Sequence, residues 1–536
     1  MRSYVQQGIV YVVVAVSIFA IYRYSKNQST EYTNPRGPVI EPEVSLTYHD
    51  GSVHTSPLPV ATTRRFRNVF YVWCDTRFEF KHYLSVKSVL RFLSPDSVKI
   101  YHRRYMHPGA DIYNTWLQEI AEKNPLITVH QLSWLYSHHA CIGKAKANPS
   151  FVDRLTEQRE DHLYVNERVL LTTSEIDLSA IVVGDGLLVA GNGSVIRRNS
   201  TPDSTENVCA TVSQFIVSGG KQACVVAYAG PLFPRDIVEL DNSYGRLART
   251  LFYGTSKIRR PQPKYDELIP NIGHMVWLGG GEMDFLFYLS VLSLVFVAKV
   301  DAVFIHGEAP PRGTFWNLLK NNRKVQHVFG RGDGEDVVSQ SESLRIDIMF
   351  KYGGIYVDRD VIFTKPLSHR LRGYDAIATI DIMAWPRFPN AIQGGVLAGK
   401  PRTAFWHNMR QSLKTVSSEV FCYRACLLPY LVWERHPDLL LIEPHFQLTC
   451  HEGKCQPTWY PHFLVDYVVQ SEVYLEHTVD RIDREEVNSL HFTGNYPTEL
   501  SDYKSLIRAN STMFSDIGKY VLNTSGTLDY FTSSMR

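Results

Sequence analysis

Beyond position 67, the order of apolar and polar residues predicts strands and helices in alternation. In the segment Asn68–His102, a short apolar run is followed by a turn, an apolar stretch of helical length and a second apolar run. The segment Asn271–His306 has the same order, and each first run is closed by a tryptophan, Trp73 or Trp277. Strands that alternate with helices are typical of a parallel α/β sheet. We therefore predict an α/β protein with one such unit in each half.

The two similar segments lie too far apart for a solenoid, whose repeats are about 20–50 residues long. We interpret them as the openings of two tandem domains of one type, at residues 63–255 and 256–536. The chain has 536 residues. Since domains usually contain about 100–200 residues, this length agrees with the division.

The beginning of the chain has a different pattern. Gly8–Tyr22 carries no charged side chain, and it is slightly shorter than the ~17–25 apolar residues that span a bilayer. We predict a transmembrane signal-anchor at 8–22, behind a short cytoplasmic tail at 1–7. A cleaved signal peptide is the alternative, although no A-x-A site follows the apolar stretch. Residues 23–62 are polar and rich in proline, which predicts a stem.

The net charge limits the kinds of partner that the protein could bind, and the glycosylation sequons indicate its compartment. The chain has 56 Lys and Arg against 54 Asp and Glu, so its formal net charge is only +2. Nucleic-acid binding needs a stronger basic field, and we expect no nucleic-acid partner. N-x-S/T sequons suit a lumenal chain, and they occur at Asn27, Asn192, Asn199, Asn510 and Asn523. We therefore expect a single-pass type II protein with its domains in the lumen.

The cysteines suit an oxidising compartment, because their number, eight, is even. Cys450 and Cys455 flank the short sequence HEGK, which indicates a tight loop, and Cys209 and Cys224 bracket another short segment. Free buried thiols are the alternative. A zinc site is disfavoured because the cysteines that such a site would need lack C-x-x-C spacing. That set is Cys422, Cys426, Cys450 and Cys455.

The segment Ser339–Leu367 carries the most informative pattern. Its first part predicts a helix capped by Ser339, with Glu342 completing a capping box and Gly353 ending the helix. The apolar face of this helix consists of Leu344, Ile348 and Tyr352. The run IYVDRDVIF that follows is rich in β-branched and aromatic residues and predicts a strand.

Two carboxylates lie two positions apart on this strand or at its exit. Side chains at such positions share one face, so Asp358 and Asp360 point to one site while Arg359 points away. A divalent cation relieves the repulsion between them, and carboxylate oxygens suit Mn²⁺ or Mg²⁺. Such an ion can neutralise a diphosphate leaving group. The alternative from spacing alone is a solvated, charged strand end.

This whole segment resembles the DXD sugar-binding region of glycosyltransferase family 32 and its relatives. These include α-1,4-galactosyltransferases, yeast initiating α-1,6-mannosyltransferases and clostridial glucosylating toxins. Their signature has the form S-D-x-x-R-x-x-x-L-x-x-x-G-G-x-Y-x-D-x-D. The corresponding positions here are Ser341, Glu342, Arg345, Met349, Gly353, Gly354, Tyr356, Asp358 and Asp360. A looser likeness covers about residues 268–500 and includes IPNIGHMVW, similar to the opening I-P-x-x-x-H-x-x-W strand of that family.

The resemblance implies two tandem GT-A-like (Rossmann-like) domains, a UDP-linked or other nucleotide-sugar donor, Mn²⁺ or Mg²⁺, and retention of the anomeric configuration. It also implies a Golgi membrane protein. Asp358 would contact the ribose or a metal-bound water, Asp360 would bind the metal, and Arg345 would bind donor hydroxyls or phosphate. These three are the predicted catalytic residues. The predicted donor-binding residues are Trp277 near the base, His274, Glu342, Tyr356 and Gln393.

Three assignments keep an alternative. Glu342 replaces the aspartate of the family, and it either touches the sugar or caps the helix. His491, in LHFTGNYP, occupies the place of a family histidine near the metal and is the third predicted metal ligand with Asp358 and Asp360. The tryptophan-containing motif of the family is missing around it, so a structural histidine is the alternative. For a retaining reaction no nucleophile is assigned, and Asp381 and Gln393 are pocket candidates only.

The first domain lacks the D-x-D pattern. When Ser174 is laid on Ser341 without gaps, Gly191 and Gly193 fall opposite the two aspartates. We therefore predict a degenerate, non-catalytic copy that supports the second domain or binds acceptor.

The favoured function is transfer of a hexose or N-acetylhexosamine from a nucleotide sugar to a glycan, glycolipid or glycoprotein acceptor. A non-catalytic carbohydrate-binding or scaffold pseudoenzyme of the secretory pathway is the first alternative. An adhesion module held by the same membrane span is the second. The intact acids and Arg345 in the second domain favour the enzyme.

Overall fold

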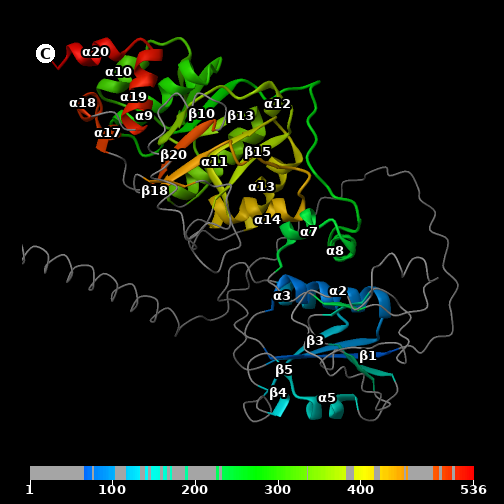
Figure 1. The fold of residues 1–536 in the computed structure, drawn as a ribbon. Helices are drawn as coiled ribbons and strands as arrows, with labels where there is room; N and C mark the ends of the chain where they lie inside the picture. The colour runs from blue at the N-terminus through cyan, green and yellow to red at the C-terminus, as the bar shows by residue number, and fades with distance from the viewer. Residues whose placement is uncertain are drawn as a thin grey trace, which may run out of the picture.

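The structure is a computed structural model with two lobes. Figure 1 shows the first lobe in blue and cyan and the second from green to red, with α7 and α8 between them. The described residues are 66–74, 78–102, 116–132, 139–142, 146–156, 161–165, 169–171, 188–190, 225–227, 232–334, 336–381, 391–415, 423–451, 454–456, 487–493, 498–509 and 513–535.

The second lobe is built on a seven-stranded sheet with the strand order β12-β11-β10-β13-β16-β15-β17. The first four of these strands are parallel, β16 is antiparallel to β13, and β15 is antiparallel to β16. The predicted α/β class with parallel strands is confirmed. The strands are β10 Ile272–Val276, β11 Ala302–Gly307, β12 Val325–Phe329, β13 Gly354–Val357, β15 Ala376–Asp381, β16 Ala391–Gly399 and β17 Leu441–Ile442.

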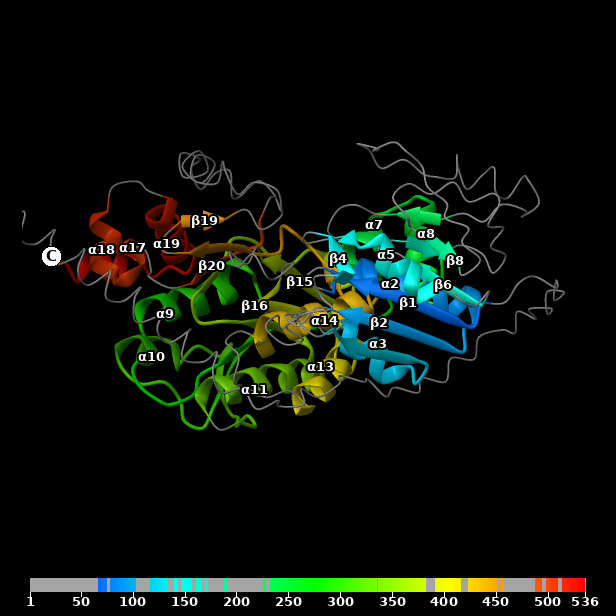
Figure 2. The ribbon, with the colours of Figure 1, turned by 90° about the horizontal axis from the view of Figure 1, so that it is seen from below.

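Helices cover both faces of this sheet, as the alternation of side chains along β13 requires. Tyr356 lies in the core shared with α11, α13 and α14, whereas Ile355 and Val357 lie in the core shared with α9, η1 and α19. Figure 2 shows α11 and α13 side by side. The helices are α9 Phe285–Leu292, the π-helix η1 Ser293–Val297, α10 Thr314–Leu319, α11 Val337–Tyr352, α12 His369–Arg372, α13 Ala404–Thr415, the π-helix η2 Tyr423–Leu427, α14 Leu428–Arg435, α17 Thr498–Ser501, α18 Tyr503–Arg508, α19 Met513–Thr524 and α20 Leu528–Ser533.

A smaller sheet lies beside the large one and has the order β14-β20-β18-β19. β14 (Val361–Phe363) follows β13 almost directly and pairs antiparallel with β20 (Ser489–Thr493). β20 is parallel to β18 (Leu448–His451), which forms a hairpin with β19 (Lys454–Gln456). This sheet brings a distant part of the chain to the end of β13.

The first lobe contains a five-stranded sheet with the order β3-β2-β1-β6-β8 and a separate β7-β9 pair. Its strands are β1 Asn68–Trp73, β2 Ser97–His102, β3 Ile127–Gln131, β4 Cys141–Ile142, β5 Lys146–Ala147, β6 His162–Val165, β7 Val169–Leu171, β8 Leu188–Ala190 and β9 Val225–Ala227. The helices that precede the second lobe are α2 Phe80–Leu93, α3 Trp116–Lys123, α5 Pro149–Thr156, α7 Pro234–Glu239 and α8 Ser243–Tyr253.

The two lobes use the same strand connections. β3-β2-β1-β6 is parallel throughout, as β12-β11-β10-β13 is, and in each sheet the next strand is antiparallel. The antiparallel pair β7-β9 then corresponds to β14-β20. The predicted order of strand, turn, helix and strand is present in both similar segments. The boundary at 255/256 stays a prediction.

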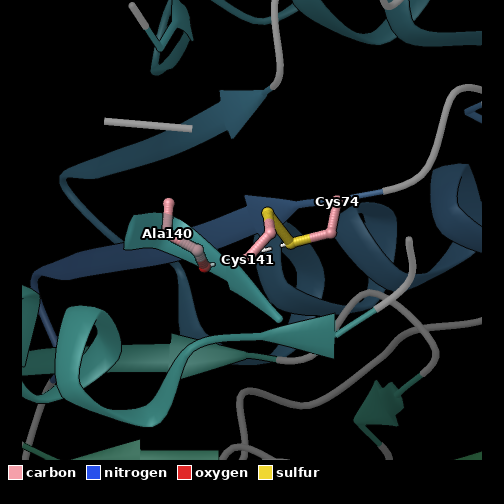
Figure 3. The surroundings of a disulfide bond; sticks show 3 residues. All are labelled: Cys74, Ala140 and Cys141. Carbon is pink, nitrogen blue, oxygen red and sulfur yellow. Dashed lines mark hydrogen bonds between the residues drawn. A yellow bond between two sulfur atoms is a disulfide. The ribbon is translucent and has the colours of Figure 1, made fainter. Parts of the chain in front are cut away.

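The first lobe contains a disulfide that the sequence analysis did not predict. Cys74 follows β1, Cys141 opens β4, and the bond joins them across a sequence separation of 67 (Figure 3). Its two ends are too far apart in the chain for spacing to predict their pairing. Both cysteines are buried.

The remaining cysteine predictions have different outcomes. The β18–β19 hairpin places Cys450 directly across from Cys455, so the tight loop is confirmed. Cys426 is disulfide-bonded, so its sulfur is not available to bind zinc. The zinc site that the sequence analysis disfavoured is therefore wrong at this cysteine. No cysteine among the described residues is free. Cys209 and Cys224 lie outside those residues.

The predicted tail, signal-anchor and stem, residues 1–62, lie outside the described residues, as do the sequons at Asn27, Asn192, Asn199 and Asn510. Asn523 is described and is exposed near the end of α19. Within the described ranges, no helix combines the length and the apolar character that a membrane crossing needs.

Replacing both Cys74 and Cys141 with serine removes a covalent constraint on the unfolded chain. For a closed loop of this length, we expect the free energy of unfolding to fall by about 4 kcal/mol. Urea unfolding followed by tryptophan fluorescence measures the change, with reduced wild-type protein as the control. Equal unfolding midpoints for the variant and the oxidised wild type would contradict the prediction.

Candidate metal centre and adjoining pocket

The two aspartates lie in the short turn that links β13 to β14. The Asp358 amide donates to the Gly395 carbonyl of β16 at 2.8 Å, and its own carbonyl accepts from the Val361 amide at 3.2 Å. The Asp360 carbonyl accepts from the Phe492 amide at 2.9 Å. The turn is therefore attached to both sheets, which restricts the positions of the two carboxylates.

His491 completes a three-residue cluster with the aspartates. The register of β14 and β20 pairs Val361 with His491, and His491 Nε2 lies 3.2 Å from Asp360 Oδ1. One potential ligand atom from each of Asp358, Asp360 and His491 lies within 4.8 Å of the other two. Two carboxylate oxygens and one imidazole nitrogen are a donor set that fits a divalent cation. The three predicted metal ligands therefore lie together.

Asp358 is held from behind by two buried side chains. Tyr356 Oη donates to its Oδ1 at 2.6 Å, and Arg345 Nη2 lies 3.3 Å from the same oxygen. Arg345 Nη1 also donates to the Gly394 carbonyl at 2.8 Å, and its guanidinium lies 4.6 Å from the centre of the Tyr356 ring. Arg345 is therefore positioned to orient Asp358, a role that the sequence analysis did not consider.

The electrostatics agree with this arrangement. Burial raises the pKa of Tyr356 well above its usual value, so its hydroxyl keeps the proton that it donates to Asp358. Burial alone would lower the pKa of Arg345, but Asp358, Tyr356 and Glu342 together more than offset that effect and raise it. Arg345 therefore stays charged beside Asp358.

Two glycines of β16 leave the space that this cluster needs. A Cβ at Gly394 would lie 2.6 Å from Arg345 Nη1, and a Cβ at Gly395 would overlap the His491 ring. Gln447 Nε2 lies 3.3 Å from His491 Nδ1 on the other side of the ring. Sequence reasoning missed Gly395 and Gln447, because only the strand pairing shows that they touch His491.

A cavity of about 530 Å³ adjoins the cluster, and Asp358 belongs to both. The cavity lies between the first turns of α11, the start of β16 and η2. It is lined by Asp336, Val337, Val338, Ser339, Ser341, Glu342, Arg345, Asp358, Gln393, Gly394, Arg424, Ala425 and Cys426. Predicted site residues Glu342, Arg345, Asp358 and Gln393 are therefore brought together in one pocket.

Glu342 faces this pocket and does not cap α11. The helix begins at Val337, and Asp336 is its N-cap, with Oδ1 accepting from the Ser339 amide at 2.8 Å. The predicted cap at Ser339 is wrong because Asp336, three residues earlier, supplies the acceptor. Glu342 instead lies beside Arg424 of η2, with 3.7 Å between Oε2 and Nε. Burial raises the pKa of Glu342 against the opposing effect of Arg345 and Arg424.

Three predicted donor-binding residues do not line the pocket. His274 is buried in β10, where its Nδ1 lies 2.9 Å from Nε2 of His306. Burial lowers the pKa of His274 to about 3, so the ring is neutral near pH 7. Trp277 is 7% exposed and stacks on Phe287. Tyr356 donates a hydrogen bond to Asp358 and does not line the pocket itself. The side chain of Asp381, the other pocket candidate, lies outside the described residues.

Because the two lobes share a strand order, their strands can be aligned with one another. This alignment differs from the one that the sequence analysis predicted. β6 and β7 are separated by Asn166, Glu167 and Arg168, just as β13 and β14 are separated by Asp358, Arg359 and Asp360. β8 is the antiparallel neighbour of β6, so it corresponds to β16. The overlay that set Gly191 and Gly193, just after β8, opposite the acids is therefore wrong.

The third metal ligand also lacks a counterpart in the first lobe. Val169 of β7 pairs with Ala227 of β9, and the corresponding pair in the second lobe is Val361 and His491. Counted along the sequence, Asn166 and Arg168 take the places of the two aspartates, although they lie outside the described residues, and Ala227 takes the place of His491. This set contains an arginine and an alanine, neither of which binds a metal in proteins.

The segment that carries the two aspartates also matches a known protein family. Residues 317–378 match the family model "Glycosyltransferase sugar-binding region containing DXD motif". Glucan organizing enzyme 1 of Cryptococcus neoformans is 23% identical over 198 residues, 33% of this chain and 54% of that protein. The chain thus matches about half the length of this curated relative. Both matches support a glycosyltransferase family in general terms.

Solved structures give only distant likenesses. The PaToxG glycosyltransferase has a TM-score of 0.25 and 14% identity, over 38% of this chain and 78% of that one. The galactosyltransferase LgtC, solved with donor and acceptor sugar analogs, has a TM-score of 0.29 and 12% identity, over 48% and 96% of the two chains. TM-scores this low do not establish a shared fold.

Replacing Gly395 with alanine should displace the His491 ring without removing any ligand. We expect the affinity for Mn²⁺ to fall by about 10–100-fold, as for other changes next to a metal ligand. Isothermal titration measures the affinity, and the control is the same substitution in a His491→Ala background. There the change should have almost no further effect. An equal loss in both backgrounds would show that Gly395 does not act through His491.

Proposed function

We propose that this protein is a metal-dependent glycosyltransferase that moves a hexose or N-acetylhexosamine from a nucleotide sugar to a glycan acceptor. One observation carries the proposal: Asp358 belongs both to a cluster suited to a cation and to a cavity of about 530 Å³. Asp358 and Asp360 lie within residues 317–378, the segment that matches the sugar-binding family model. A charged ligand and a sugar can therefore be held side by side.

The residues that would hold the cation are Asp358, Asp360 and His491. The imidazole in the set favours a transition-metal ion, so Mn²⁺ suits it better than Mg²⁺. When bound, the ion supplies positive charge that stabilises a departing diphosphate. Arg345 and Tyr356 keep Asp358 in place, and Gly395 leaves room for His491. We infer a UDP-linked donor from the family resemblance.

The adjoining pocket offers groups that suit sugar hydroxyls. Glu342 accepts hydrogen bonds, Arg424 donates them, and the Gln393 amide does both. All three line the cavity together with Asp358, next to which the bond to the leaving group would lie. We propose that the transferred sugar occupies this cavity and that the acceptor hydroxyl attacks from the same face, with retention of configuration.

We also propose that the enzyme is a type II protein of the Golgi membrane with its catalytic lobe in the lumen. The apolar segment 8–22 and the proline-rich segment 23–62 support this arrangement. The disulfide between Cys74 and Cys141 agrees with an oxidising compartment. A lumenal acceptor would then be a glycan on a glycoprotein or glycolipid.

Asp358→Asn and Asp360→Asn test the proposal directly. In wild-type protein, Mn²⁺ and a matching donor at 100 times its Kd should stabilise the fold by about 2.7 kcal/mol. Both variants should fold, lose that stabilisation and lose sugar transfer by at least about 100-fold. Thermal shift with a panel of nucleotide sugars, followed by product analysis, measures both effects.

Asp301→Asn is the matched control, because Asp301 is exposed in the turn before β11 and far along the strand from the cluster. Its stabilisation and turnover should equal those of wild type. Unchanged turnover in the two cluster variants would contradict the mechanism. Donor binding without transfer to any acceptor would instead favour the pseudoenzyme.

A further inference from the structure

An ion pair between a buried carboxylate and a partly buried guanidinium connects the two lobes. Arg435, at the end of α14, donates to Glu119 of α3 through Nη1 at 3.2 Å and Nη2 at 2.7 Å. Glu119 is 8% exposed. Burial would raise the pKa of Glu119, but Arg435 and Lys123, whose Nζ lies 3.5 Å from Oε1, together more than offset that effect, so the pKa lies below its usual value. Two-point contact between planar groups fixes their relative orientation as well as their distance.

Aromatic side chains lie beside this ion pair and cover part of it. The Arg435 guanidinium lies 5.3 Å from the Trp116 ring centre and 5.9 Å from that of Phe252. Tyr83 Oη donates to Glu119 Oε1 at 3.4 Å. Next to the pair, Tyr253 Oη donates to the Glu434 carbonyl at 2.7 Å. The last turn of α14 is thus bound to the first lobe and to α8.

The other end of the same helical segment lines the pocket. η2 leads into α14 without a break, and its Arg424 lies beside Glu342 in the cavity. Arg424 and Arg435 are separated by about 16 Å at the usual helical rise. A π-helical turn such as η2 is frequent at functional sites, because it shifts a side chain out of the regular helical register. A rotation or shift of α14 would therefore move Arg424.

We propose that the first lobe is a positioning domain for the sugar pocket: its Glu119 holds Arg435, and α14 transmits that position to Arg424 beside Glu342. The inference rests on the proposed function for its kinetic consequence, but its structural part stands independently. At the one matching position that the structure describes, Ala227 takes the place of His491, and a supporting role is compatible with this exchange. Arg435 acts through Arg424 and is a positioning residue.

Glu119→Gln tests the inference in the full-length protein, because it keeps the shape of the side chain and removes its charge. Hydrogen exchange followed by mass spectrometry should show amides of 423–427 exchanging at least about tenfold faster. Glu443→Gln is the matched control, since it breaks the Arg370–Glu443 pair at 2.9 Å, which contacts neither α14 nor the pocket. Protection of 423–427 should be unchanged there.

The kinetic measurement is a double-mutant cycle between Glu119→Gln and Arg424→Lys. We expect Glu119→Gln to raise the KM for the donor by about tenfold with a smaller change in kcat. In the Arg424→Lys background its effect should nearly vanish, because coupled positions are not additive. Additive effects, or unchanged exchange of 423–427 in Glu119→Gln, would overturn the inference.

Tyr253→Phe covers the case in which Glu119→Gln does not fold. It removes the hydroxyl that donates to the Glu434 carbonyl at 2.7 Å and, at 3.4 Å, to the Pro234 carbonyl, and it should speed exchange at 423–427 to a smaller extent. No change in exchange with this variant would also overturn the inference. If exchange responds as expected while wild-type protein transfers no sugar, the proposed function fails and the structural coupling stands.

Discussion

The pairing of β14 with β20 is the contact on which the rest of the site depends. It places His491 beside Asp360, although more than a hundred residues of chain separate them. The aspartates themselves are local to one turn, and without β20 they would be two acids at a strand end. With it, they face an imidazole that is 4% exposed and held by Gln447. Proximity of three ligands at a rigid edge is what a cation site requires.

Local sequence patterns predicted much of this architecture. The apolar runs around Trp73 and Trp277 became β1 and β10, and Gly353, with a φ of 63°, ends α11 as expected. The two aspartates lie close together as predicted, but in the turn after β13 and not on the strand itself. These features depend on neighbours along the chain, and such neighbours are visible in a sequence.

Features that depend on distant contacts could not be read in the same way. The disulfide between Cys74 and Cys141 requires that the end of β1 lie near β4, which no spacing rule provides. Arg424 became a pocket residue only because η2 packs against α11. His274 fitted the motif, yet the sheet places it against His306, away from the cavity. The family resemblance thus located the region better than it located individual side chains.

The two lobes share one strand order but differ in the residues at matching positions. The second lobe keeps two acids and a histidine at the edge of β13 and β14, whereas the matching positions of the first lobe carry Asn166, Arg168 and Ala227. The first lobe also provides a buried carboxylate, Glu119, which binds Arg435 of the second lobe.

Anomalous diffraction at the manganese edge, from crystals grown with Mn²⁺, tests the central claim most directly. The account predicts a peak in the second lobe with Asp360 and His491 as direct ligands and Asp358 on the same ion or its water. It also predicts no peak between the strands β6 and β7 of the first lobe. A manganese ion bound elsewhere, with His491 still hydrogen-bonded to Asp360 and the cluster empty, would contradict it.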